Sequence, residues 1–160
     1  MSRTGAVPGH WEGDLIAGER NSWIVTLVER HSRYVMLAGV AKRDSQSVVA
    51  ALTGQIQHLP RELRLSLTWD RGTEMAEHKD LALATKIDIY FCDPHSPWQR
   101  GTNENTNRLL RQYFPKGTDL SAHSQAHFDA VARELNERPR KTLNYLSPAE
   151  KFEECVAAIG

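Results

Sequence analysis

Three carboxylates stand at places where an acid is unusual unless it does chemistry. Asp14 interrupts the apolar run HWEGDLIAG, Asp70 directly follows the apolar segment SLTW, and Glu104 opens the helical pattern ENTNRLL. Merely solubilising charges are seldom placed in such strand-like runs. Hard divalent cations prefer oxygen ligands, and two of them about 4 Å apart can activate an attacking oxygen and stabilise a leaving one. We therefore predict that Asp14, Asp70 and Glu104 hold two Mg²⁺ ions.

Other acids compete for the same role, since the chain has 20 Asp and Glu residues and offers many such trios by chance. Glu12 shares a strand face with Asp14 by two-residue alternation. Glu74 and Asp93 also lie near the predicted site in the sequence. Each of the three stays open as a substitute for a member of the trio.

The order of elements indicates how distant acids are brought together. Runs of β-branched and aromatic residues separated by polar turns predict strands at 11–16, 23–28, 34–40, 65–69 and 87–92. Apolar periodicity and capping residues predict helices after Asp44 or Ser45 up to Pro60, then at 75–86, 104–114, 125–136 and from Ser147-Pro148.

The resulting order βββαβαβ, followed by helices, predicts an α/β protein with a mixed five-stranded sheet flanked by helices. Catalytic residues in such folds often gather at strand ends. This is the order of the ribonuclease H-like fold, and 160 residues suit one domain, here 1–160. If the first strand pairs beside the fourth, Asp14 and Asp70 face one edge and Glu104 approaches from a helix.

The helix that begins at Glu104 has one polar and one apolar side. Glu104, Arg108 and Arg111 fall at i, i+4 and i+7, which places them on one face that can meet phosphate. An ordinary surface ion pair between Glu104 and Arg108 is the alternative. We predict DNA contacts from the amide and guanidinium groups of Gln99, Arg100, Asn103, Asn107, Arg108 and Arg111. Plain loop and cap roles stay open for Arg100 and the amide residues.

A second basic run, Arg138-Pro139-Arg140-Lys141, has two interpretations: it follows a DNA backbone, or it is a solvated helix end. Whole-chain charge does not decide, since 20 Lys and Arg balance 20 Asp and Glu.

Several classes of protein and site are disfavoured. His123 and His127 have helical i, i+4 spacing, but no third zinc ligand follows in a known pattern. Two cysteines without CxxC spacing indicate neither a disulfide framework nor a cysteine-rich zinc site. No stretch approaches the apolar length of a membrane span, and the N-terminus has no apolar signal region. We expect a cytoplasmic protein without a membrane partner.

At these residues the chain resembles the DDE integrase-core domain of bacterial insertion-sequence transposases, above all the insertion sequence thirty family. The resemblance runs from GHWEGDLI to LNYLSPAEKFEE and is most specific in HWEGDLIAG, VERHSRYVML, LTWDRGTEMAEH, IYFCDPHSPWQRGTNENTNRLLRQYFPKGTDLS and LNERPRKTLNYLSPAE. It implies a ribonuclease H-like fold, catalytic Asp14, Asp70 and Glu104, and Arg111 near the bound DNA end.

The same resemblance implies cleavage and transfer of DNA strands at transposon ends, Mg²⁺ or Mn²⁺ as cofactor, and a homo-oligomer, at least a dimer, on DNA. Such transposases carry helix-turn-helix segments before the core, yet here only nine residues precede His10. We therefore expect an isolated core whose DNA binding is weak, non-specific and reduced by salt. A hydrolytic nuclease and a catalytically silent DNA-binding or interaction remnant remain as alternatives.

Overall fold

Five strands form one mixed sheet in the order β3-β2-β1-β4-β5. The computed structural model describes residues 7–40, 42, 44–69, 78–91 and 101–159. The strands are β1 (His10–Ala17), β2 (Trp23–Glu29), β3 (Val35–Val40), β4 (Ser66–Trp69) and β5 (Asp88–Phe91). β1, β2 and β3 pair antiparallel, whereas β4 runs parallel to both β1 and β5. The first and fourth strands are neighbours, which was the condition for Asp14 and Asp70 to face one edge.

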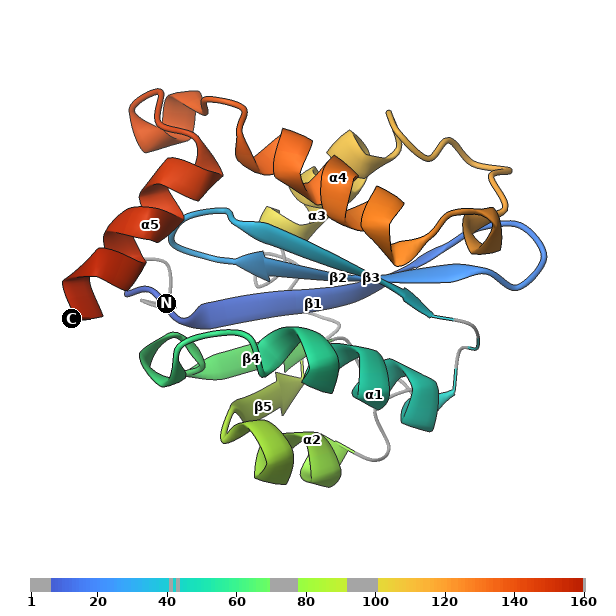
Figure 1. Cartoon of the computed structure of the whole chain (residues 1–160), viewed down its shortest axis with the longest axis horizontal. Coiled ribbons are helices and arrows are strands. Elements are labelled where there is room, and N and C mark those ends of the chain that lie inside the picture. Colours follow the sequence, from blue (N-terminus) through green and yellow to red (C-terminus); the bar gives the residue numbers. More distant parts are fainter. Residues whose placement is uncertain (1–6, 41, 43, 70–77, 92–100, 160) are drawn as a thin grey trace.

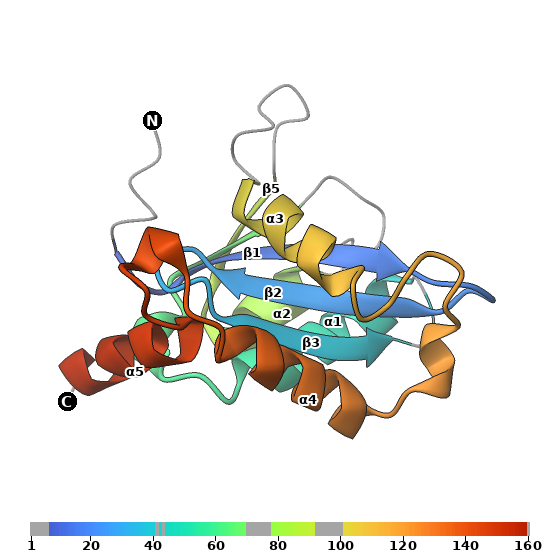
Figure 2. The same cartoon turned by 90° about the horizontal axis from the view of Figure 1, so that it is seen from above.

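Helices cover both faces of this sheet (Figure 1). The helices are α1 (Ser45–Ile56), α2 (His78–Thr85), α3 (Gly101–Leu110), α4 (Gln125–Asn136) and α5 (Pro148–Ile159). α1 and α2 lie on one side of the sheet and α3 and α4 on the other, with α3 across β1 and β2 and α4 along β3 (Figure 2). Short 3-10 turns at Arg61–Leu63, Leu120–Ala122 and Lys141–Leu143 join some of these elements.

Each face of the sheet has its own apolar core because side chains alternate along a strand. Trp11 and Leu67 belong to the cluster under α1, and Ile16 and Val28 to the cluster under α3 and α4. Within the described part of the chain, none of the helices has the length and apolar character that crossing a membrane requires.

Local signals explain where several helices begin. The carboxylate of Asp44 accepts from the backbone N–H of Ser47 at 2.7 Å, which confirms Asp44 as the cap of α1. Ser147 and Glu150 exchange hydrogen bonds in a capping box, 2.9 and 3.1 Å, at the start of α5. α4 has the predicted bounds.

The bounds predicted for the helix at 104–114 are wrong. α3 begins at Gly101 and ends at Leu110. The following residues form turns before Pro115, which disfavours helical backbone at the residue ahead of it. Glu104 therefore lies within the first turn of α3 instead of opening the helix.

Candidate active site

Asp14 lies in the middle of β1, with β2 on one side and β4 on the other. In its partly exposed carboxylate, Oδ1 accepts from the N–H of Leu15 and Oδ2 accepts from Nδ2 of Asn107 on α3, both at 2.8 Å. Opposite it on β2, the buried Thr26 hydroxyl lies 3.4 Å from the Asp14 carbonyl oxygen. The carboxylate is thus oriented from the strand and from a helix, while part of it stays accessible.

The alternation of β1 explains why this acid points toward α3. Trp11 and Leu15 pack in the cluster under α1, whereas Ile16 packs in the cluster under α3 and α4. Asp14, two residues before Ile16, shares its face. The amide that reaches Asp14 has a clear orientation: a carboxylate accepts, so the Asn107 amide must present its NH₂ group to it.

Glu104 precedes Asn107 on α3 by three residues, so the two positions lie on the same side of the helix. The contact of Asn107 with Asp14 therefore brings the Glu104 position to the side of α3 that faces β1. The side chain of Glu104 is outside the described part of the structure.

Asp70 lies outside the described residues, but its chain neighbour Trp69 ends β4 beside β1. A Cβ added to Gly13 would lie only 2.4 and 2.5 Å from Cε3 and Cζ3 of the buried Trp69 ring. The residues that precede Asp14 and Asp70 are therefore in direct contact, which only glycine at position 13 permits. The acid trio stays a prediction, with β1, β4 and α3 arranged as it requires.

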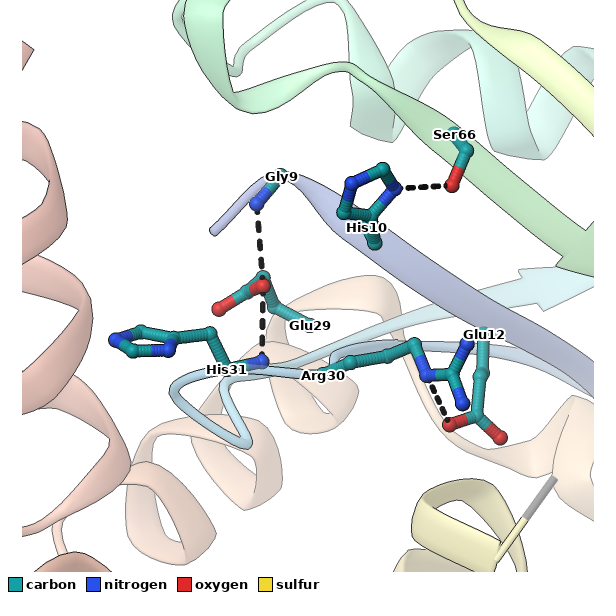
Figure 3. A network of polar contacts seen from close by, with 7 residues as sticks. All are labelled: Gly9, His10, Glu12, Glu29, Arg30, His31 and Ser66. Carbon is teal, nitrogen blue, oxygen red and sulfur yellow. Dashed lines mark hydrogen bonds and ion pairs between the residues drawn. The ribbon is translucent and has the colours of Figure 1, made fainter. Parts of the chain in front are cut away.

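Of the open substitutes, Glu12 is fully buried and forms an ion pair with Arg30, with 3.2 Å between Oε2 and Nε (Figure 3). Glu74 and Asp93 lie outside the described residues. Sequence reasoning gave Glu12 no partner, because Arg30 comes from the turn after β2 and reaches β1 only through the antiparallel pairing.

A second buried carboxylate, Glu29, was missed in the sequence (Figure 3). Its oxygens accept from the backbone N–H groups of Gly9, His31 and Ser32 at 3.2, 3.0 and 2.8 Å, and from the Ser32 hydroxyl at 2.7 Å. These bonds tie the start of β1 to the turn between β2 and β3. The acidic end of the apolar run WIVTLVE was the available signal.

The predicted DNA-contact residues have different positions. Asn107 contacts Asp14; Arg108 donates to Asn105 at 2.6 Å; and Arg111 donates to the carbonyl oxygens of Ala17 and Phe114 at 3.1 and 3.4 Å. Gln99 and Arg100 lie outside the described residues, as does the side chain of Asn103. Arg111 thus joins the end of α3 to the end of β1, and a DNA contact from it stays a prediction.

The rings of His123 and His127, the pair considered as zinc ligands, are stacked. Their centroids lie 4.5 Å apart and their planes are inclined by 19°. Phe114 meets both rings edge-on. Across the residues that the structure describes, His, Cys, Asp and Glu do not gather in a group of three that could hold a metal ion. His123 and His127 belong to an aromatic cluster at the start of α4.

Residues 5–97 match the integrase core domain family. The chain is 56% identical over 149 residues to the transposase InsI for insertion sequence element IS30A of Escherichia coli K12, which covers 93% of this chain and 39% of that protein. It is also 56% identical over 152 residues to the transposase for insertion sequence element IS1086 of Cupriavidus metallidurans, covering 94% of this chain and 45% of that protein.

A more distant transposase also matches nearly the whole chain. The transposase for insertion sequence element IS4351 of Bacteroides fragilis is 36% identical over 149 residues, which cover 92% of this chain and 45% of that protein. The chain spans less than half the length of these curated relatives.

The crystal structure of the catalytic core domain of BIV integrase superposes with a TM-score of 0.70 at 19% identity, covering 95% of this chain and 99% of that one. This likeness confirms the predicted ribonuclease H-like fold. The family match covers more than half of the sequence and the motif resemblance is confirmed by the relatives. The chain therefore belongs to the integrase core domain family and is related to the transposases of the insertion sequence thirty family.

Proposed function

We propose that this chain is the catalytic core of a transposase, which cleaves DNA and transfers the strands at transposon ends with a divalent metal as cofactor. The observation that carries the proposal is the 2.8 Å contact between Asn107 and Asp14, which fixes α3, with Glu104 one turn earlier, against β1. Similarity to transposases over more than nine-tenths of the chain supports the same activity.

Asp14, Asp70 and Glu104 are the residues proposed to hold Mg²⁺ or Mn²⁺. A partly exposed carboxylate on the α3 face of β1 fits a hard cation, because its oxygens face away from the apolar core under α1. Two such ions supply activation of the attacking oxygen and stabilisation of the leaving one.

The protein's own contribution is positioning. β1 and α3 hold the Asp14 carboxylate in one orientation, and the Asn107 amide keeps one of its oxygens directed along a fixed line. Arg111 ties the far end of α3 to Ala17, so the helix is fixed relative to β1 at two points. In the proposed reaction, a water oxygen attacks the scissile phosphorus and the P–O3′ bond breaks, which leaves a 5′-phosphate and a free 3′-hydroxyl. That hydroxyl then attacks a target phosphorus in line, and the 3′ oxygen of the target strand leaves.

The partners proposed for this chain are the transposon ends, target DNA and at least one further copy of the chain. The DNA-bound assembly belongs in the cytoplasm, at the nucleoid. Phosphate and base contacts are proposed from Gln99, Arg100, Asn103, Asn107, Arg108 and Arg111.

The decisive experiment uses a pre-nicked, labelled DNA end with Mn²⁺ or Mg²⁺ and compares the native chain with Glu104→Gln. Joined products that disappear in the variant support the proposal. Cleaved but unjoined DNA would identify a hydrolytic nuclease instead. Metal binding without cleavage in either protein would mean that N-terminal DNA-binding segments are required or that the chain is a silent remnant.

A further inference from the structure

The segment that joins α4 to α5 concentrates positive charge in a chain whose total charge is zero. It carries Arg138, Arg140 and Lys141 against the single acid Glu137. Lys141 is exposed, and Arg138 and Arg140 are partly exposed. We name this segment, residues 137–147, the basic loop.

The backbone of the basic loop is held in one shape. Arg140 donates its N–H to Leu146 at 2.9 Å and accepts from the N–H of Tyr145 at 2.8 Å, while the side chain of Leu143 is buried between these points. Asn144 and Tyr145 have positive φ angles of 54° and 67°, which close the turn. The basic side chains therefore extend from a backbone of fixed shape, so the loop loses little conformational entropy when a ligand binds.

Arg138 is positioned by its neighbours and still reaches solvent. Its guanidinium hydrogen bonds to the hydroxyl of Tyr113, lies 5.5 Å from the centre of that ring, and is 3.9 Å from a carboxylate oxygen of Glu134. The Arg138 side chain nevertheless remains 42% exposed. Its planar group keeps donors available for a ligand at the surface.

Arg140 is placed where its positive charge is disfavoured. Burial lowers the pKa of Arg140, and the nearby charges of Arg138 and Arg33 lower it further. A guanidinium nevertheless stays charged at neutral pH. Arg33 comes from the turn between β2 and β3, so two distant segments bring like charges together. An anion bound among these groups removes the repulsion.

The same turn connects the basic loop to the face that carries Asp14. Arg30, three residues before Arg33, pairs with Glu12 on β1. Glu12 and Asp14 lie on one face of the strand, about 7 Å apart at about 3.3 Å per residue. The turn that carries Arg33 is therefore tied through Arg30 and Glu12 to the strand that carries Asp14.

We propose that Arg33, Arg138, Arg140 and Lys141 form a phosphate-binding site for the DNA backbone, in addition to the contacts proposed from α3. This inference rests on the proposed function, because it takes DNA as the ligand. Tyr145, which is 68% exposed at the end of the loop, adds an aromatic face against which a sugar or an unpaired base can pack. Such a site recognises the charge of the DNA backbone and not the base sequence.

The test measures the affinity of the 160-residue chain for a labelled duplex of arbitrary sequence between about 50 and 200 mM salt. In the double variant Arg140→Gln and Lys141→Gln, the slope of log affinity against log salt should fall by about 2, with roughly tenfold weaker binding. The charge-conserving variant Arg140→Lys with Lys141→Arg should keep the native slope.

The matched control is Lys42→Gln with Arg61→Gln, which neutralises two exposed cations, one in the segment between β3 and α1 and one in the 3-10 turn Arg61–Leu63. Its slope should equal the native one. The melting temperature at low salt separates binding from a structural role. A slope that falls while the melting temperature stays at the native value supports a binding role, and a native slope in a variant that melts normally would overturn the proposal.

An unchanged slope in the Gln variant, in a chain that still joins DNA strands, would overturn the basic-loop site and leave the proposed function intact. A native chain that neither binds DNA nor joins strands would overturn both. If the Gln variant loses binding to polyglutamate while DNA binding is unchanged, the loop is a site for an acidic protein segment, and our proposal is wrong.

Discussion

Nδ2 of Asn107 lies 2.8 Å from Oδ2 of Asp14, and this hydrogen bond joins a helix that begins at Gly101 to the central strand of the sheet. Among the described residues, no donor hydrogen bonds to the buried Oδ1 atom of Asn107. The side chain therefore makes its described polar contact with the acid alone. This contact orients the Asp14 carboxylate.

We expect Asn107→Ala to slow metal-dependent strand cleavage by roughly 10- to 100-fold, the usual effect of removing a group that orients a metal ligand. Asn107→Asp should be slower still, because a second carboxylate then faces Asp14 in place of a donor. The measurement is the cleavage rate as a function of Mn²⁺ concentration. The Asp variant should also change the metal dependence.

Asn105→Ala is the matched control, since Asn105 is exposed on the same helix and contacts Arg108 instead of Asp14. Equal rates in the two alanine variants would show that the Asn107 contact has no positioning role.

The amphipathic pattern of α4 predicted both of its ends because Phe128, Val131, Ala132 and Leu135 are all buried against the sheet. The pattern failed for α3, whose first turn, GTNE, has no apolar residue to mark it. The predicted helix ran on to Phe114 because this residue continues the apolar pattern. Its side chain is indeed buried, but the backbone at this point is no longer helical.

The candidate site was less predictable than the strands. Residue types and context identified Asp14, but its contact with Asn107 depends on how α3 crosses β1, which local patterns do not encode. The same holds for Arg111, whose reach to the Ala17 carbonyl spans distant parts of the chain. The pairing of Glu12 with Arg30 likewise follows from strand register.

Gly13→Ala should destabilise the protein by about 1–3 kcal/mol, because the added methyl group overlaps the Trp69 ring in a packed interior. It should also reduce cleavage, since Trp69 immediately precedes Asp70. Urea unfolding measures the first effect and the strand-joining assay the second. A variant with native stability would contradict the close contact of β1 with β4.

Gly54→Ala provides the opposite case within α1. A Cβ there meets nothing within 4 Å, and alanine is favoured over glycine in a helix. We expect this variant to gain about 0.5–1 kcal/mol and to keep native cleavage.

His10 should make stability depend on pH. Burial lowers the pKa of His10, the charge of Arg30 lowers it further, and Glu29 acts in the opposite direction. The folded protein therefore binds fewer protons at this site than the unfolded chain. Stability contributed by neutral His10 is present above about pH 6.5 and is lost as the pH falls from there toward the lowered folded pKa.

Urea unfolding at about pH 7.5 and about pH 5.5 tests this, with His10→Gln compared with the native chain. Glutamine can keep a hydrogen bond to Ser66, whose hydroxyl lies 2.6 Å from Nδ1 of His10. The variant should lose less stability on acidification than the native chain does. His58→Gln, at an exposed site, should behave like the native chain, and equal losses in all three would refute the assignment.

The outer edge of β3 is closed by two amide side chains from α4. Asn136 accepts from the N–H of Val35 at 2.8 Å and donates to its carbonyl at 2.9 Å, in the manner of a neighbouring strand. Gln125 does the same at the N–H of Gly39 and the carbonyl of Leu37, at 3.0 and 2.8 Å. Asn136 is buried, whereas Gln125 is exposed.

Asn136→Ala should therefore cost about 2 kcal/mol or more, since two buried backbone groups of Val35 lose their partner. Gln125→Ala should cost less than about 1 kcal/mol, because water can reach Gly39 and replace the amide. Urea unfolding measures both. An Asn136→Ala loss no larger than that of Gln125→Ala would mean that the amide does not seal this edge. If the Asn136 amide does satisfy the edge of β3, the variant should also self-associate through this strand, because an unpaired strand edge pairs readily with another copy.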